Sequence, residues 1–294
     1  MHLRPAIQRV PDQNQSTRNA MPPDVANPDR ITVETISDCV ALAVKLKNQW
    51  FPHETTWGPW FRGHTEDNWK LAPKLYRVPP PKRGIRIIED EIRQEFMMRA
   101  PGLTDKGPQN SWEWYFTMQH FGAPTRLLDW TEGVLIALYF AVRDGSGEND
   151  AAIWALDPWW LNKRVVRERE VVPPGAEIGI SEQDAARYGP WLPDRYSTAE
   201  LPELPVGVYP THTARRISTQ RSCFTIHGSA ADGLERLACE SDAHIAKVII
   251  PRTEVSRIKE ELVVSGIDEV TIFPDLDGLG RYLTTVLQSE ADAK

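Results

Sequence analysis

The chain has 294 residues, with 34 Lys and Arg against 41 Asp and Glu, so its formal net charge at neutral pH is −7. The mean hydropathy is −0.43, and no apolar run approaches the roughly 18 residues that a membrane span requires. These values exclude an integral membrane protein and argue against non-specific binding along nucleic acid, which needs a positive field. Two counts are high, 11 Trp and 24 Pro, and they predict aromatic walls and long loops.

The cysteines and the N-terminal segment bear on the compartment. Cys39, Cys223 and Cys239 are widely spaced, which fits neither a disulfide framework nor a CxxC-type metal site. Residues 1–30 lack a continuous apolar core and a cleavage pattern, so they are no secretory signal, and their polar, Pro-rich composition predicts a disordered tail. We therefore expect a cytoplasmic protein without a membrane partner.

Hydrophobic periodicity predicts the elements of the first half of the chain. In chain order these are a helix over residues 38–47, a short strand over 57–62, a charged helix over 82–99, an aromatic helix over 112–121 and a strongly apolar helix over 134–142. Thr35 or Ser37 is the expected N-cap of the first helix. Gly122 and Pro124 are expected to end the aromatic helix.

The second half predicts more strands and a long insertion. The expected elements are strands over residues 151–156, 216–226 and 246–250, a helix over 253–264 closed by Gly266, a short strand over 269–273 and a final helix to about residue 288. Between about 162 and 210, many Pro and charged residues with little periodicity predict an insertion that crosses the surface. No linker interrupts residues 31–294, so a single α+β domain is expected.

The segment Trp60-Phe61-Arg62-Gly63 places an Arg between aromatic residues and a Gly. A guanidinium offers five donors in a fixed fork that suits phosphate or carboxylate. Glycine lets a ligand or another backbone approach closely. Taken alone, the segment is explained more simply by an Arg that packs on Trp or pairs with a carboxylate to hold the fold together.

Residues 119–131 gather an amide, an imidazole, an Arg, an Asp and two hydroxyls directly before the most apolar helix. Polar groups at the edge of a core are costly unless they satisfy one another or a ligand. Two interpretations stay open and are compatible with each other. Either an Arg126–Asp129 ion pair fixes the loop, with His120 as a satisfied loop residue, or these groups bind a ligand.

Two later segments carry further polar residues. Strand alternation would place Arg216, Ser218, Gln220, Ser222 and Phe224 on one face, which is either exposed or lines a cleft. In the same strand a buried, unreactive Cys223 is more common than a nucleophile beside His227. Residues 272–278 hold two Asp, whose simplest role is a turn and a helix N-cap, and other ligands for a metal are missing.

These segments together resemble the FRG domain family, which is named for its Phe-Arg-Gly motif. The segments that carry the resemblance are Phe61-Arg62-Gly63, Leu71-Ala-Pro-Lys-Leu-Tyr-Arg77, residues 119–131, residues 216–224 and residues 273–278. They follow one another in order across about residues 57–283. Their layout is also similar to that of the ADP-ribosyltransferase superfamily, which implies a split, mostly antiparallel sheet flanked by helices.

The resemblance implies roles for particular residues. Arg62 would hold NAD, the segment Asp129-Trp130-Thr131 would precede the apolar helix, and residues 216–224 would supply the third strand. Gln220 and Ser222 stand where that superfamily usually has Glu. The implied catalytic residues are Asp129, Gln220 and His120, the implied NAD-binding residues are Arg62, Gly63, Thr125, Arg126, Thr131 and Phe224, and the implied acceptor-binding residues are Arg216, Arg221 and Trp130.

We therefore expect an NAD-dependent ADP-ribosyltransferase that acts on nucleic acid, with a DNA base favoured, or on protein. NAD would be the co-substrate without a metal, and single-stranded DNA or RNA would be the partner, bound through a local basic track. The alternative is a non-catalytic FRG sensor that binds a nucleotide or a protein. A nuclease or phosphatase is a weaker third hypothesis, because it needs a metal cluster.

Overall fold

The computed structural model describes residues 31–79, 82–103, 107–108, 110–144, 148–167, 170–171, 187–193, 200–210 and 219–292, with side chains as far as residue 288. The predictions of a disordered tail over residues 1–30 and of a role for Arg216 lie outside these residues. Within the described part, no helix combines the length and apolar character that crossing a membrane requires.

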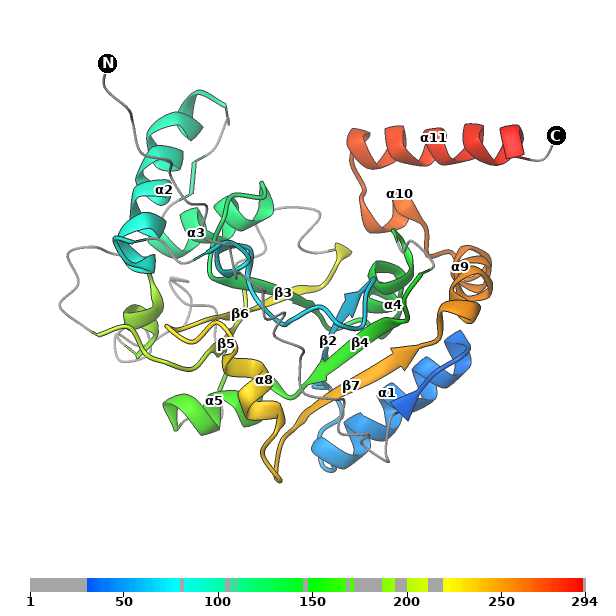
Figure 1. The fold of residues 1–294 in the computed structure, drawn as a ribbon, viewed down its shortest axis with the longest axis horizontal. Helices are drawn as coiled ribbons and strands as arrows, with labels where there is room; N and C mark the ends of the chain where they lie inside the picture. Colours follow the sequence, from blue (N-terminus) through cyan, green and yellow to red (C-terminus); the bar gives the residue numbers. More distant parts are fainter. Residues whose placement is uncertain are drawn as a thin grey trace, which may run out of the picture. The chain divides into compact units, whose positions relative to one another are not determined.

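The described strands form one mixed seven-stranded sheet in the order β1-β7-β4-β2-β3-β6-β5 (Figure 1). The strands are β1 (Ile31–Thr32), β2 (Trp60–His64), β3 (Leu127–Thr131), β4 (Ala151–Leu156), β5 (Val206–Val208), β6 (Ser222–Ile226) and β7 (Ile245–Ile250). Among the described strands, β1 and β7 pair in parallel and the other neighbours are antiparallel. The predicted α+β class with a mostly antiparallel sheet is confirmed.

The sheet has a weak join in its middle. Strand β2 pairs with β4 along its whole length, and β3 pairs with β6 along its whole length. Between β2 and β3, in contrast, Phe61 and Thr131 form the single registered pair. Beyond that pair β2 and β3 have no further registered pairs. The sheet is therefore divided into two halves that meet at Phe61 and Thr131.

Helices flank the sheet. The helices are α1 (Ile36–Trp50), α2 (Ile85–Arg99), α3 (Ser111–His120), α4 (Val134–Val142), α5 (Pro158–Val166), α8 (Gly233–Ala238), α9 (Val255–Val264), α10 (Glu269–Ile272) and α11 (Leu276–Asp292), with short 3-10 turns η1 (Lys74–Tyr76), η2 (Ala100–Gly102), η3 (Gly189–Trp191) and η4 (Arg252–Glu254). Helices α1, α3, α5 and α10 begin with a side-chain cap. Thr35 caps α1, because its side chain accepts from the Asp38 amide at 3.1 Å.

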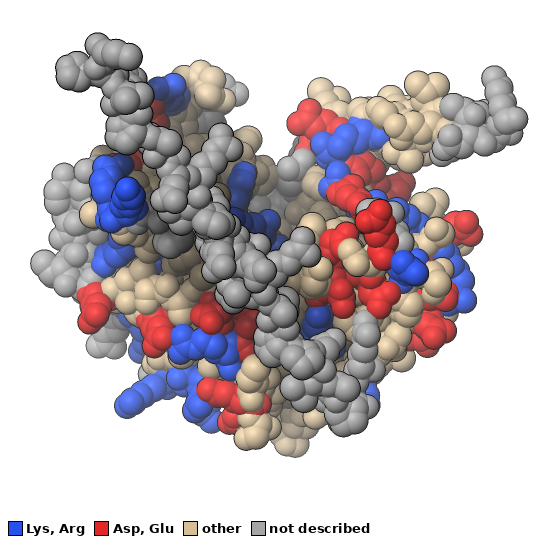
Figure 2. All heavy atoms as spheres, in the orientation of Figure 1, with Lys and Arg blue, Asp and Glu red and all other residues tan. Residues whose placement is uncertain are grey.

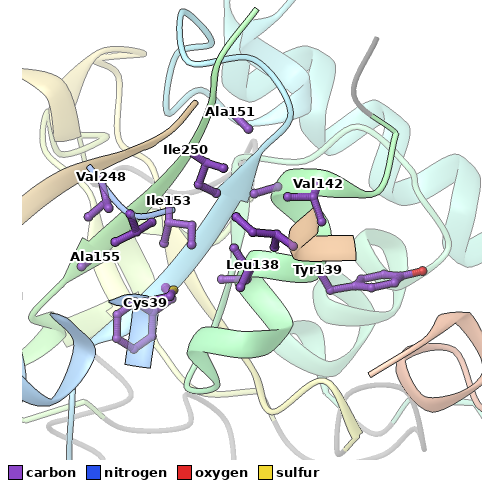
Figure 3. Packing of buried hydrophobic residues seen from close by; sticks show 14 of the residues in the cluster. Cys39, Leu138, Tyr139, Val142, Ala151, Ile153, Ala155, Val248 and Ile250 are labelled. Carbon is purple, nitrogen blue, oxygen red and sulfur yellow. The ribbon is translucent and has the colours of Figure 1, made fainter. Parts of the chain in front are cut away.

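The largest core cluster lies between α4 and the sheet (Figure 3). Leu138 and Val142 of α4 lie beside Ile153 of β4 and Ile250 of β7, and Cys39 of α1 joins them. Residues 134–142 are strongly apolar because α4 packs against β2 and β4 of the sheet and also against helices α1 and α9. The apolar helix therefore stands directly behind the strand that carries Arg62.

Two predicted elements are wrong. The predicted strand over residues 269–273 is instead helix α10 over Glu269–Ile272, which Asp268 caps by accepting from the Thr271 amide at 2.8 Å. The insertion over residues 162–210 does not merely cross the surface. In its described parts Asn162, Tyr188 and Trp191 are buried, and β5 adds an edge strand to the sheet.

Strand β6 is shorter than the predicted strand over residues 216–226. It begins at Ser222, directly after Arg221, whose φ of 46° places it in the left-handed region. Residues 211–218 lie outside the described part, and Gln220 precedes the strand instead of belonging to it. The predicted polar strand face is therefore reduced to Ser222 and Phe224, with Gln220 in the preceding turn.

Candidate functional site

A cavity of about 400 Å³ opens where β2 and β3 separate. Its walls come from β2, β3, β6, the C-terminal end of α3, helix α4 and Phe273. The predicted site residues that line it are Arg62, Gly63, His120, Asp129, Trp130, Thr131, Gln220 and Phe224. The junction of the two sheet halves thus brings together residues from segments far apart in the sequence.

Arg62 bridges the gap between the two strands. Its Nη1 donates to the backbone oxygen of Asp129 at 2.6 Å and lies 3.9 Å from the Asp129 carboxylate. Its Nε donates to Nε2 of His64 at 3.1 Å, and its side chain keeps 16% of its surface exposed. The predicted role in holding the fold together is therefore present. The Nη2 group has no partner among the described residues, so a donor remains for a ligand.

The charge state of this pair follows from burial. Burial lowers the pKa of Arg62 to about 10, the Asp129 carboxylate opposes that fall, and the charge of Arg77 adds to it. Burial, with the neighbouring Arg62 charge, lowers the pKa of His64 to about 3. His64 is therefore neutral at physiological pH, and its Nε2 lone pair is available to accept from Arg62.

Asp129 is held by a relay of side chains but stays open to the cavity. Its Oδ2 accepts from Nε2 of Gln119 at 2.8 Å, and the Gln119 carbonyl oxygen accepts from the Thr125 hydroxyl. Thr125 in turn accepts from the Leu127 amide at 3.1 Å. The Asp129 side chain is 56% exposed. Thr125 is thus a residue that positions Gln119, and it does not line the cavity.

Gly63 is required by a neighbouring backbone. A Cβ atom at this position would lie 2.0 Å from the carbonyl oxygen of Ala137 and 2.5 Å from the amide nitrogen of Ala141. Both atoms belong to the backbone of α4, which cannot yield as a flexible side chain can. Of the two reasons predicted for this glycine, the close approach of another backbone is the one that the geometry supplies.

Arg126 lies in the core instead of the cavity. It is fully buried and pairs with Glu89 of α2, its Nε lying 2.5 Å from Oε2 of that carboxylate. Its Nη1 and Nη2 donate to the backbone oxygens of His227 and Trp191. The expected Arg126–Asp129 ion pair is therefore wrong. A guanidinium committed in this way cannot reach NAD in the cavity, and the NAD-binding role implied for Arg126 is not supported.

Of the two aromatic residues predicted at the site, Phe224 places its ring in the cavity wall, whereas the Trp130 ring points to the other face of the sheet. The Trp130 side chain is buried on the sheet face opposite Asp129, where its Nε1 donates to the Thr225 hydroxyl at 3.0 Å. Phe224 stacks on Phe116 with ring centroids 5.4 Å apart and forms part of the cavity wall. Strand alternation is the reason, because Trp130 and Asp129 are successive residues of β3.

Thr131 and Gln220 are tied into the frame of the site. The Thr131 hydroxyl donates to the Gln220 backbone oxygen at 2.7 Å and accepts from the Gly133 amide at 3.0 Å. The Gln220 side chain donates to the backbone oxygen of Ile272 at 3.2 Å. Both residues face the cavity while holding together β3, the turn before β6, and α10.

Arg221 and Cys223 both lie outside the cavity lining. Arg221 pairs with Glu132 at 3.2 Å. The expectation of a buried, unreactive Cys223 is confirmed, because Cys223 is fully buried and burial raises its pKa well above the ordinary thiol value. The described residues contain no group of three His, Cys, Asp or Glu placed to hold a metal ion.

Several wall residues were not predicted from the sequence. Trp69, half exposed, and Asp144 line the rim, and Phe140 packs edge-on against Phe273. Phe273 also carries a guanidinium on its ring, with Arg281 at 4.7 Å from the centroid. Phe273 lies in a segment that resembles the FRG family, which was a usable signal. No periodicity distinguishes Trp69 from the other ten tryptophans.

The fold and the cavity define an α+β protein with a polar site at the junction of two sheet halves. Residues 58–150 match the model of the FRG domain, and this match supports the resemblance to that family. No curated protein and no solved structure matches the chain. The matched residues include Arg62, Gly63, His120 and Asp129, whereas Gln220, Phe224 and Phe273 complete the same cavity from outside the matched region.

Proposed function

We propose that this protein is an NAD-dependent ADP-ribosyltransferase that modifies nucleic acid, with an unpaired DNA base as the favoured acceptor. The observation that carries the proposal is the placement of Arg62 and the relay-held Asp129 against one cavity with aromatic walls. The cavity volume of about 400 Å³ falls within the range of small-molecule sites.

The chemistry explains why these residue types are needed. The bond between C1′ of the ribose and the nicotinamide nitrogen breaks, nicotinamide leaves with the electron pair, and the ribose develops oxocarbenium character. The acceptor nucleophile then forms a bond to C1′ and loses a proton. A fixed negative charge beside the ribose and a cation for the diphosphate lower the barrier by stabilising charge that is otherwise costly.

Each side chain has a role in the proposed reaction. The Asp129 carboxylate, oriented by Gln119, stabilises the cationic ribose. The Nη2 group of Arg62 binds the diphosphate, and Phe224 with Phe140 forms the wall against which nicotinamide packs. His120, at the end of α3 and in the cavity lining, accepts the proton of the acceptor through a ring nitrogen.

The test is the release of nicotinamide from NAD in the presence of single-stranded DNA. We expect Asp129→Asn to lower the rate by about 100-fold or more, because the amide keeps the shape and removes the charge. Asp242→Asn, an exposed change outside the cavity lining, is the matched control and should keep the wild-type rate. Full turnover by a folded Asp129→Asn variant would contradict the proposed role.

A second candidate is a non-catalytic FRG sensor that binds a nucleotide or a protein. It is favoured by Gln220 and Ser222 at the place where a Glu is expected, and by the described carboxylates that line the cavity, which are Asp129 and Asp144 alone. Thermal shift separates the two candidates. A rise in melting temperature with NAD, without nicotinamide release across a broad panel of acceptors, would favour the sensor.

A further inference from the structure

The segment Leu71–Arg77 resembles the FRG family, yet the proposed reaction gives it no role. The structure fixes it firmly to the protein. Leu75 is buried and its amide donates to the Thr125 backbone oxygen at 3.3 Å, while the Tyr76 hydroxyl donates to the Gly228 backbone oxygen. Lys74 and Arg77, which flank these two anchors in the chain, are exposed. The turn η1 is thus a rigid support that presents two cations to solvent.

These two cations have no acidic partner among the described residues. Lys74 donates through Nζ to the Gly122 backbone oxygen at 2.5 Å, and Arg77 donates through Nε to the Ala72 backbone oxygen at 3.0 Å. These bonds orient both side chains and leave the Nη groups of Arg77 and further Nζ protons of Lys74 for a ligand. Arg77 also lies close enough to Arg62 for its charge to lower the pKa of Arg62.

A continuous path leads from Lys74 into the cavity. The Gly122 oxygen that Lys74 binds follows Phe121 in the chain, and the Phe121 side chain is 70% exposed. Its ring meets the His120 ring edge-on at 4.9 Å, and His120 lines the cavity. The order along the surface is therefore cation, exposed aromatic ring, then the cavity with the proposed catalytic groups.

Figure 2 shows Lys and Arg side chains in the hollow beside α3, whereas acidic side chains gather near α10. The net charge of −7 is thus unevenly distributed over the surface. A strand with a negative backbone is attracted to the α3 side of the hollow and repelled from the other side. This asymmetry also explains how an acidic protein can accept a nucleic acid locally.

We propose that Lys74 and Arg77 bind a backbone phosphate of a single-stranded nucleic-acid acceptor, that Phe121 stacks on one of its bases, and that the neighbouring base enters the cavity. Cations that follow the backbone together with aromatic stacking platforms are the usual means of holding unpaired strands. The naming of this ligand as the acceptor rests on the proposed function. Binding of the strand itself does not.

The phosphates of NAD are the other source of the same chemistry, and the geometry argues against them. Neither Lys74 nor Arg77 belongs to the cavity lining, whereas Arg62 does. The diphosphate of a dinucleotide in the cavity is therefore assigned to Arg62, and the outer pair is assigned to the acceptor. This division predicts that changes at η1 act on oligonucleotide binding and leave NAD binding unchanged.

The test is fluorescence anisotropy of a labelled, mixed-sequence single-stranded DNA, without NAD, over a series of salt concentrations. We expect Lys74→Gln with Arg77→Gln to weaken binding at least tenfold. The slope of log affinity against log salt should become shallower by about 0.7, the contribution of one phosphate contact on a single strand. Lys45→Gln with Lys163→Gln, which removes the same charge from α1 and α5, is the matched control and should bind as wild type.

Two further variants separate a binding role from a structural one. Lys74→Arg with Arg77→Lys retains both charges and should restore most of the affinity. Phe121→Leu should weaken binding to the oligonucleotide and leave an abasic strand of the same length unaffected. Equal affinity of the Gln double variant and the wild type, or loss of affinity in the charge-retaining variant with a native melting temperature, would overturn the proposal.

Failure of the phosphate site and failure of the proposed enzyme activity give different results. Binding that depends on Lys74 and Arg77 without any nicotinamide release supports the phosphate site and removes the enzyme. Nicotinamide release with an unchanged KM for the oligonucleotide in the Gln double variant supports the enzyme and removes the phosphate site. NAD titration by calorimetry completes the comparison, since the Gln double variant should keep the wild-type affinity for NAD.

Discussion

Arg62 and Gly63 show how one short motif serves the frame and the site together. The Arg62 side chain crosses from β2 to the backbone of Asp129, beyond the point where the pairing of the two strands stops. The next residue lets α4 lie directly against β2. The motif therefore sets the width of the gap between the strands, and the cavity occupies that gap.

The close packing of α4 on Gly63 predicts that a larger residue at this position lowers the free energy of unfolding. Gly63→Ala places a methyl group 2.0 Å from a backbone oxygen of α4, so helix and strand must move apart. We expect a loss of about 3 kcal/mol or more in the free energy of unfolding, at the upper end of overpacking effects. Urea denaturation measures it. Gly102→Ala, where a Cβ meets nothing within 4 Å, is the control and should change stability by less than about 0.5 kcal/mol.

The site residues show which features of the cavity could be predicted from the sequence. Arg62, Asp129 and Phe224 could be chosen because a cation, a carboxylate and an aromatic ring match a chemistry. Arg126 and Trp130 satisfy the same criterion, yet one pairs with Glu89 in the core and the other points to the opposite sheet face. Only tertiary contacts distinguish these cases, because a buried partner 37 residues away, as Glu89 is from Arg126, leaves no local signal.

At the scale of elements, periodicity predicted most helices and strands, and a helix cap explains one of the exceptions. Residues 134–142 are apolar throughout because α4 is covered on several sides, and this was visible in the sequence. Residues 269–272 contain β-branched residues typical of strands, but the Asp268 cap makes them a helix. In the insertion, the polar composition gave no sign that Asn162 is buried and hydrogen-bonded to the edge strand β5.

Asn162 joins α5 to β5. Its amide donates to the Gly207 backbone oxygen at 2.9 Å, and its oxygen accepts from the Gly207 amide at 2.7 Å. Asn162→Ala leaves both backbone groups buried without partners, so we expect a loss of about 2–4 kcal/mol in the free energy of unfolding. Urea denaturation is the measurement, with Lys163→Ala, an exposed neighbour, as the control. Equal stability of the two variants would show that β5 does not depend on this contact.

For the whole molecule, two buried neutral histidines predict sensitivity to acid. Burial lowers the pKa of both His64 and His227 to about 3 in the folded state, below the unfolded value near 6.5. Between these values the unfolded state binds more protons, so stability is full above about pH 6.5 and falls as the pH drops. Each histidine contributes a slope of up to about 1.4 kcal/mol per pH unit.

The corresponding variant is His227→Phe. Removing one buried imidazole should make the fall in stability between pH 6.5 and 4.5 shallower by up to about 1.4 kcal/mol per pH unit. Urea unfolding at a series of pH values gives both curves. Parallel curves for the variant and the wild type would mean that His227 is not held neutral in the folded protein.

The central claim is that the cavity between the two sheet halves transfers ADP-ribose from NAD to an unpaired nucleic-acid base. The most direct measurement incubates the whole chain with NAD and, separately, single-stranded DNA, duplex DNA, RNA and protein, and weighs the products by mass spectrometry. If the proposed function is right, single-stranded nucleic acid incubated with the wild type gains the mass of one ADP-ribose. The same acceptor incubated with Asp129→Asn gains no mass. Unmodified acceptors in every sample, from a folded protein that binds NAD, would contradict the proposed function.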